Sequence, residues 1–218
     1  MKIKWYGHAA FGLTTGKGVR IVIDPYEPGG FGGAIGHSPI TDQADIVLVT
    51  HDHGDHNHTS TLKGPFTEVR AEGSYDLKGV KVSAFPVYHD ASKGKERGKN
   101  IVFVIEADGL KVVHTGDLGH LLDQDVLDRI GRVDVLMLPV GGTYTITAAE
   151  AGKVVDALKP SLIFPMHYKT EKVAFPLTPV EDFTKGKKGV KKVGASEIEV
   201  ASGSLPQEPE IILLQFAN

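Results

Sequence analysis

The sequence has 218 residues, enough for one large domain with a sizeable core, and its 41% hydrophobic and 23% charged residues lie within the ordinary globular range. Its net charge of -3 provides no overall basic field for nucleic acid, so an anionic substrate would have to meet local positive charge. Because the chain contains no cysteine, disulfides, thiolate metal sites, iron–sulfur clusters and a cysteine nucleophile are excluded. A metal site here must use His, Asp and Glu.

The start of the chain and its overall pattern indicate one domain in the cytoplasm. Residues 1–6 do not begin a signal peptide, and no uninterrupted apolar run is long enough to cross a membrane. No internal repeat, heptad pattern or long linker divides the sequence. We therefore expect residues 1–218 to form a single cytoplasmic domain with no membrane partner.

Short apolar, β-branched runs bounded by Gly, Pro and Asp predict strands. In chain order they cover residues 20–24, 44–50, 80–88, 100–107, 111–115, 133–139, 161–166 and 210–216. Helices are predicted at 121–130 and 147–158, the second with a capping box of Thr147 and Glu150 at its start and Pro160 after its end. Because strands and helices are interleaved, the fold class is mixed α and β.

Two irregular stretches are long enough to form pocket walls: the Gly-rich residues 28–39 and the polar residues 90–100. The glycines of the first do not form the G-x-G-x-x-G motif, so a dinucleotide site is rejected. The second stretch gathers positive charge that could steer a phosphate or carboxylate, although a solvated charged surface is the alternative. Its cations are Lys93, Lys95, Arg97 and Lys99.

The strongest chemical signal follows the predicted strand 44–50, where the sequence continues as His51-Asp52-His53-Gly54-Asp55-His56. Side chains alternate along an extended segment, so His51 and His53 point to the same side and can bind one metal ion. Gly54 permits a turn that directs Asp55 and His56 toward a second position. The alternative is a polar loop on the surface. Three His and two Asp within six residues favour a site for two adjacent metal ions instead.

Further ligands have to come from elsewhere in the fold, because a zinc-like ion needs four or more. His89, Asp117 and His167 each lie at the C-terminal end of a predicted apolar strand. Folds that mix helices and strands build their sites where such strand ends gather on one rim. We therefore expect these three side chains to join the histidine cluster.

Taken together in this order, these motifs resemble the metallo-β-lactamase superfamily over roughly residues 3–168. Three shorter segments resemble, more narrowly, its branch of small metal-dependent hydrolases, which also resembles ascorbate phosphate lactonase. They are Gly7-His8-Ala9-Ala10-Phe11, Ile23-Asp24-Pro25 and Leu138-Pro139-Val140-Gly141-Gly142-Thr143. The resemblance implies a four-layer αββα sandwich of two facing mixed β-sheets, with the site along one edge.

The resemblance also implies a role for each candidate ligand. The first metal would be bound by His51, His53 and His89, the second by Asp55, His56 and His167, with Asp117 bridging them. Two cations about 3.5 Å apart turn a bridging water into hydroxide at neutral pH and polarise the substrate. Zinc is favoured, and manganese or iron(II) also suit the oxygen-rich second position. A small ester, lactone or phosphoester is the expected substrate, and an anionic one stays open.

Three residues have supporting or catalytic roles in this interpretation. His8 is expected near the metals as a hydrogen-bond donor or substrate contact, and Asp24 resembles an aspartate that braces the ligand loop. His120, three residues after Asp117, could protonate a leaving group. Together with the ligand candidates Asp55 and Asp117, the histidines His8 and His120 make up the catalytic candidates.

Three other functions remain open. A phosphodiesterase or nuclease could use the same metals, which the basic loop favours, but the acidic net charge and the lack of an appended nucleic-acid module argue against it. A di-iron redox protein is disfavoured because no flavin or cysteine-rich electron-transfer module is attached. A non-catalytic metal-binding domain is the third alternative. The metal identity and the question of a homo-oligomer also remain open.

Overall fold

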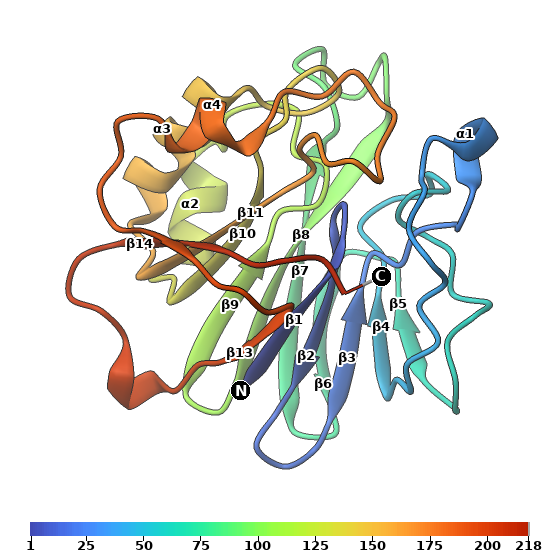
Figure 1. The fold of residues 1–218 in the computed structure, drawn as a ribbon. Helices are drawn as coiled ribbons and strands as arrows, with labels where there is room; N and C mark the ends of the chain where they lie inside the picture. Colours follow the sequence, from blue (N-terminus) through green and yellow to red (C-terminus); the bar gives the residue numbers. More distant parts are fainter. Residues whose placement is uncertain (218) are drawn as a thin grey trace.

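Two β-sheets face each other in the computed structural model, which describes residues 1–217 (Figure 1). The first has the order β13 (Glu197–Glu199), β1 (Lys2–Gly7), β2 (Ala10–Thr14), β3 (Arg20–Ile23), β4 (Ile46–Leu48) and β5 (Thr67–Val69). The second has the order β12 (Val190–Lys192), β14 (Glu210–Leu213), β11 (Leu162–Met166), β10 (Val135–Pro139), β9 (Leu110–His114), β8 (Lys99–Ala107), β7 (Val80–Tyr88) and β6 (Gly73–Leu77). Both contain parallel and antiparallel pairs, which confirms the predicted mixed sheets.

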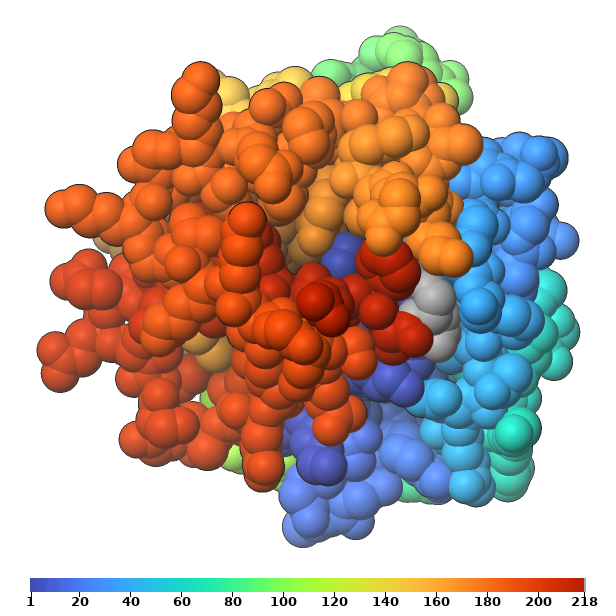
Figure 2. Space-filling view, viewed as in Figure 1, coloured from blue at the N-terminus to red at the C-terminus, as the bar shows by residue number. Residues whose placement is uncertain are grey.

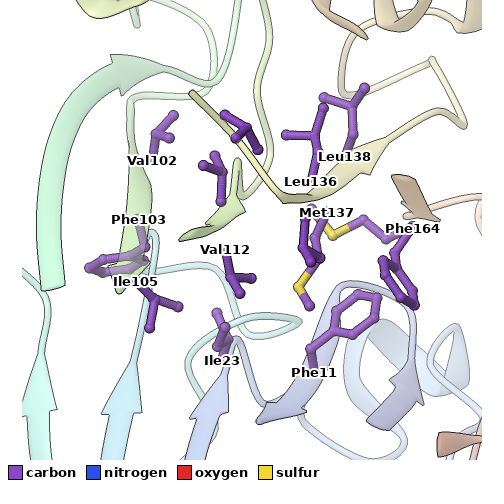
Figure 3. Close-up of a cluster of buried hydrophobic side chains, with 14 of the residues drawn as sticks. Phe11, Ile23, Val102, Phe103, Ile105, Val112, Leu136, Met137, Leu138 and Phe164 are labelled. Atoms are coloured by element: carbon purple, nitrogen blue, oxygen red, sulfur yellow. The ribbon is translucent and has the colours of Figure 1, made fainter. Parts of the chain in front are cut away.

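The hydrophobic core lies between the sheets, as the alternation of side chains along the strands requires. In β3, Ile21 and Ile23 belong to the main cluster of buried residues, whereas Val22 belongs to a second cluster on the other face. Ile23 of the first sheet approaches Val112 of the second, and the centroid of the Phe11 ring lies 6.3 Å from that of Phe164 (Figure 3). Apolar contact therefore joins the two sheets, and the polar groups collect at their edges.

Helices cover only one of the two outer faces. The eight-stranded sheet is covered by α2 (Gln124–Ile130), α3 (Ala148–Leu158) and α4 (Val180–Thr184) (Figure 1). The six-stranded sheet is covered by irregular segments between residues 25 and 66, where α1 (Gly30–Gly33) is one turn long. The resemblance implied regular helix in this fourth layer. The glycines and prolines of residues 25–39 oppose a longer helix, so the layer consists of loops.

The C-terminal part of the chain contributes to both sheets. β13 pairs antiparallel with β1, a 3-10 turn η1 (Ser202–Ser204) follows, and β14 then pairs in parallel with β11. In Figure 2 these segments, orange to red, cover much of one face and border the N-terminal residues in blue. Within residues 1–217, no helix has the length and apolar character needed to span a membrane.

The predicted strands and helices all have counterparts, but several strands were not predicted. β5, β6, β12 and β13 are short and mostly polar, so pairing with neighbouring strands defines them rather than their own pattern. The helix predicted at 121–130 begins only at Gln124. The capping box predicted at the start of α3 is confirmed.

This capping box provides a test of local stability. The Thr147 hydroxyl accepts a hydrogen bond from the Glu150 backbone N–H, and the Glu150 carboxylate accepts one from the Thr147 N–H. Replacing Thr147 with Ala is expected to lower the free energy of unfolding by about 1 kcal/mol, since it leaves a helix N–H without its partner. Urea denaturation of both proteins measures the difference. An unchanged midpoint would contradict the proposed cap.

Candidate metal centre

The candidate ligands lie at one edge of the two sheets because the strands before them end there. β7 and β9 each run antiparallel to β8, and β9, β10 and β11 are parallel, so the C-terminal ends of these strands share one edge. His89 follows β7, Asp117 follows β9 and His167 follows β11. The segment 51–56 follows β4 of the other sheet. The predicted convergence of four strand ends is therefore present.

Three groups of potential ligand atoms form at this edge, and within each group all atoms lie within 4.8 Å of one another. One group contains His51, His53 and His89, and another contains His8, Asp55, His56 and His167; the third contains His51, His56 and Asp117. The structure thus brings together the side chains predicted for each position, and His8 lies with the second group. The third group connects the first two.

Asp117 lies between the two positions. Its Oδ2 is 3.1 Å from His89 Nε2 and 3.2 Å from His167 Nε2, and its Oδ1 is 3.3 Å from His56 Nε2. Ligand atoms bound at about 2.0–2.2 Å to one ion lie about 3–3.5 Å apart, so these separations suit shared coordination. Buried atoms His51 Nε2, His56 Nε2 and Asp117 Oδ1 have no hydrogen-bond partner, which also fits a cation.

The turn after His53 has a different cause from the one expected. Gly54 does not adopt the positive φ for which glycine is specially suited. A Cβ atom added there would come within 3.3 Å of Glu27 Oε2, and the Gly54 carbonyl accepts a hydrogen bond from the Glu27 N–H. The turn therefore does not depend on the backbone freedom of glycine, and the atom nearest to an added Cβ is the flexible end of the Glu27 side chain.

Asp24 braces the ligand loop from below. Its carboxylate accepts hydrogen bonds from the Thr50 N–H at 2.8 Å, the Thr50 hydroxyl at 2.7 Å and His56 Nδ1 at 2.9 Å. The Thr50 oxygen also lies 3.0 Å from His51 Nδ1. These contacts leave Nε2 of His51 and His56 for the cluster, which is the arrangement that metal-binding histidines use. Burial alone would raise the pKa of Asp24, but His56 and other nearby histidines lower it.

Asn100 and Gly116 position Asp117, and the sequence did not identify either. The buried Asn100 amide accepts a hydrogen bond from the Asp117 N–H at 3.1 Å and donates one to the Thr115 carbonyl at 2.8 Å. Gly116 has a φ of 55°, and a Cβ atom there would overlap Asn100 and Thr50. The sequence feature that could have indicated Asn100 is its place as a polar residue at the start of an apolar strand.

Three site residues occupy a backbone region that side chains disfavour. The φ angles are 51° for His8, 49° for Asp24 and 52° for His167. Left-handed conformations of this kind cost free energy for residues other than glycine and often persist at functional sites. The surrounding structure therefore holds these three residues in a conformation of the kind that clusters at functional sites.

The cluster holds excess negative charge around its centre. Asp117, Asp55 and Asp24 raise the pKa of His56 well above its usual value, although burial would lower it. Burial and neighbouring histidines lower the pKa of His8 to about 4, and burial and His56 lower that of His51 to about 3. His8 and His51 are therefore neutral and ready to bind a divalent cation, whereas His56 would release a proton on binding one.

Comparison with known proteins identifies the family. Residues 2–167 match the sequence profile of the β-lactamase superfamily domain. The chain belongs to the metallo-β-lactamase superfamily. It is 34% identical over 195 residues to a UPF0173 metal-dependent hydrolase of Thermococcus onnurineus, covering 78% of this chain and 85% of that one. Over 219 residues it is 34% identical to a UPF0173 metal-dependent hydrolase of Archaeoglobus fulgidus, covering 86% and 91%.

A solved structure extends the comparison to nearly the whole chain. A proposed zinc-dependent hydrolase of the metallo-β-lactamase superfamily from Thermotoga maritima is 39% identical, with a TM-score of 0.82. The alignment covers 98% of this chain and 97% of that one. The fold, the family and the candidate His/Asp site together identify the chain as a metal-dependent hydrolase of this superfamily.

The sequence predicted catalytic roles for His8 and His120, and the structure places the two histidines in different surroundings. The buried His8 has its Nε2 3.1 Å from Asp55 Oδ2, so it lies inside the cluster. His120 accepts a hydrogen bond from the Tyr88 N–H at Nε2 and contacts the Leu121 carbonyl through Nδ1. Both of its ring nitrogens contact backbone and His120 belongs to none of the three ligand groups, so its role as proton donor to a leaving group stays a prediction.

The cluster opens into a cavity of about 240 Å³. Its lining consists of Phe31, His53, Asp55, His89, Arg97, Asp117, Tyr144, His167 and Phe175. Phe31 and Arg97 come from the two irregular stretches predicted to be pocket walls. A neighbouring cavity of about 490 Å³ also reaches His51 and His53 and is lined by Arg70, Arg97 and Lys99 among others.

Proposed function

We propose that this metal-dependent hydrolase uses two divalent cations to cleave a small ester, lactone or phosphoester. The observation that carries the proposal is the pair of ligand groups joined by Asp117, which touches His56, His89 and His167. With a single ion, the ligand atoms of one group would be buried without a cation to bind, which costs free energy. The narrower resemblance to ascorbate phosphate lactonase supplies one substrate type for the test.

In this proposal each position has its own ligands. His51, His53 and His89 bind the first cation, and Asp55, His56 and His167 bind the second, with Asp117 shared. Three neutral imidazoles suit zinc at the first position. The carboxylate-rich second position also suits manganese or iron(II). His8, 3.1 Å from Asp55, holds that carboxylate toward the second position.

The chain supplies orientation rather than a nucleophile. When bound, a pair of such cations provides a hydroxide nucleophile at neutral pH and polarises the substrate oxygen. Within residues 1–217, the lining of the 240 Å³ cavity contains no Ser, Thr or Cys side chain that could attack instead. Asp55 is buried within the ligand cluster, so we assign it to metal binding rather than to a free general base.

Variants of the two positions test the number of metals and the activity together. Elemental analysis of protein purified without added metal is expected to find two equivalents in the wild type. His53→Ala and His167→Ala should each retain about one equivalent, because each removes a ligand from a different position, and both should lose turnover of a panel of esters, lactones and phosphoesters. His58→Ala is the matched control, since the His58 side chain hydrogen-bonds with the exposed Ser60 and belongs to none of the three ligand groups. Undiminished turnover by metal-free protein would refute the proposal.

A phosphodiesterase is the second candidate because of the larger cavity beside the cluster. Arg70, Arg97 and Lys99 line it and could contact a phosphodiester. A generic phosphodiester assayed beside esters and lactones separates the two functions. Binding of an oligonucleotide that weakens as salt rises would extend the substrate class to nucleic acid, whereas no binding at low salt would limit it to small molecules.

A further inference from the structure

Three aromatic rings form a continuous wall at the mouth of the 240 Å³ cavity. Phe175 lies at the centre, with its ring centroid 5.4 Å from that of Phe31 and 5.7 Å from that of Tyr144. Both contacts are edge-to-face, so the rings present a connected apolar surface. We call Phe31, Tyr144 and Phe175 the aromatic rim. The candidate ligands His53, Asp55, His89, Asp117 and His167 line the same cavity.

Phe31 is held at this mouth at a cost in free energy. It lies in the Gly-rich loop at a φ of 53°, a left-handed conformation that is unusual for a bulky side chain, and 55% of its surface is exposed. Gly29 and Gly32 on either side adopt positive φ without such a cost. A large apolar side chain that is strained and still exposed to water gains by contact with an apolar ligand.

Arg97 brings a positive charge to the same mouth. Its guanidinium lies over the Tyr144 ring, 5.3 Å from the centroid, and its ion pair is a 3.6 Å contact with the exposed Glu96. Such a contact with an exposed partner contributes little and yields to a better ligand. Among the cations of this loop, Arg97 is the one that lines the cavity.

Asp90 holds the loop that carries Arg97. Its carboxylate accepts hydrogen bonds from the backbone N–H groups of Ser92, Gly94, Glu96 and Arg97 at 2.8–3.0 Å. The loop begins directly after the ligand candidate His89, so the position of the guanidinium is tied to the cluster. Figure 1 shows this loop, between β7 and β8, at the same end of the molecule as α1. Arg97 is therefore a positioned cation rather than a freely solvated one.

We propose that the substrate carries a planar apolar group, which packs against the aromatic rim, and an oxyanion, which pairs with Arg97 beside the bond that is cleaved. The inference rests on the proposed hydrolase function and names the substrate class of that site. A guanidinium matches a carboxylate or a phosphate through two parallel hydrogen bonds. The rim offers stacking and edge contacts to a ring. The two features lie side by side over one small cavity, so one small molecule meets both.

Binding measured by calorimetry on the metal-loaded protein tests this without relying on turnover. Two pairs of probes serve: benzoate with acetate, and phenyl phosphate with inorganic phosphate. Metal contacts are common to both members of a pair, so the affinity ratio isolates the ring. Each aryl probe is expected to bind at least about tenfold more tightly than its partner. Equal affinities within both pairs would overturn the proposal.

Variants assign the two contributions to their residues. Phe31→Ala should reduce the aryl preference toward one, and Phe31→Tyr should restore it. Arg97→Gln should weaken all four probes about tenfold, because it removes a charged hydrogen-bond donor, while Arg97→Lys keeps part of the affinity. Arg70→Gln is the matched control, since Arg70 lines only the neighbouring cavity. An undiminished aryl preference in Phe31→Ala, or loss with Arg70→Gln in place of Arg97→Gln, would refute the assignment.

The outcome is separable from that of the proposed function. A protein that binds aryl oxyanions through Arg97 and the aromatic rim but hydrolyses no member of the panel would refute only the hydrolase proposal. A protein that hydrolyses alkyl and aryl substrates equally well, with no effect of Phe31→Ala, would refute only the substrate class.

Discussion

Asp117→Ala is expected to remove most of the bound metal and nearly all turnover. The carboxylate lies 3.1–3.3 Å from ligand atoms of His56, His89 and His167, so its loss affects both metal positions at once. Mutation of a residue that only supports a ligand lowers metal affinity or activity by about 10- to 100-fold. A shared ligand should cost more, and we expect kcat/KM to fall by more than about 1000-fold, equivalent to over about 4 kcal/mol.

Metal content by elemental analysis and kcat/KM on the best substrate measure this effect. Asp134→Asn is a suitable control because Asp134 is also buried but lies at the other end of β10, where it accepts a hydrogen bond from the Lys111 N–H. Asp117→Ala with two tightly bound metals would contradict the shared-ligand interpretation. A circular dichroism spectrum distinguishes loss of the site from loss of the fold.

Asp24→Asn is expected to weaken metal binding by about 10- to 100-fold while leaving turnover largely intact at saturating metal. An amide cannot accept from all three donors that Asp24 satisfies, namely two on Thr50 and one on His56. His56 and, through Thr50, His51 therefore lose orientation. Asn also tolerates the left-handed backbone found at this position, so the substitution avoids added strain.

Metal titration followed by activity measures this second effect, because a positioning residue changes the metal affinity more than the maximal rate. Asp52→Asn is the matched control: Asp52 lies in the ligand loop but is exposed and pairs with Arg70 at 2.8 Å. An Asp24→Asn protein that binds metal normally yet cannot turn over would mean that Asp24 takes part in the reaction directly.

Much of the candidate site was predictable because its ligands are concentrated in local motifs. His51, His53, Asp55 and His56 fall within six residues after an apolar strand, which short-range alternation alone can interpret. His89, Asp117 and His167 share the signal of a strand end. Their order along the chain allowed the family to be identified before any distance was known.

The supporting residues were harder to predict because they lie far apart in the sequence. Asn100 accepts a hydrogen bond from the Asp117 N–H from near the start of β8, 17 residues earlier in the chain. Asp90 accepts hydrogen bonds from backbone N–H groups, which every loop has, so no residue type marks its partners. His120 was predicted from a local signal alone. Its spacing from Asp117 suggested a place at the site, but hydrogen bonds to backbone occupy its ring.

The sequence by itself determined the mixed α and β class, the capping of α3, the exclusion of thiolate chemistry and the identity of the seven candidate ligands. These depend on periodicity, residue type and short-range order, which a single strand or turn already expresses. Only the tertiary structure decided that His8 pairs with Asp55, that both ring nitrogens of His120 contact backbone, and that loops cover the outer face of the six-stranded sheet. It also decided that Phe31 and Arg97 meet at one cavity. Such contacts depend on how two sheets pack and on what fills the space between distant loops.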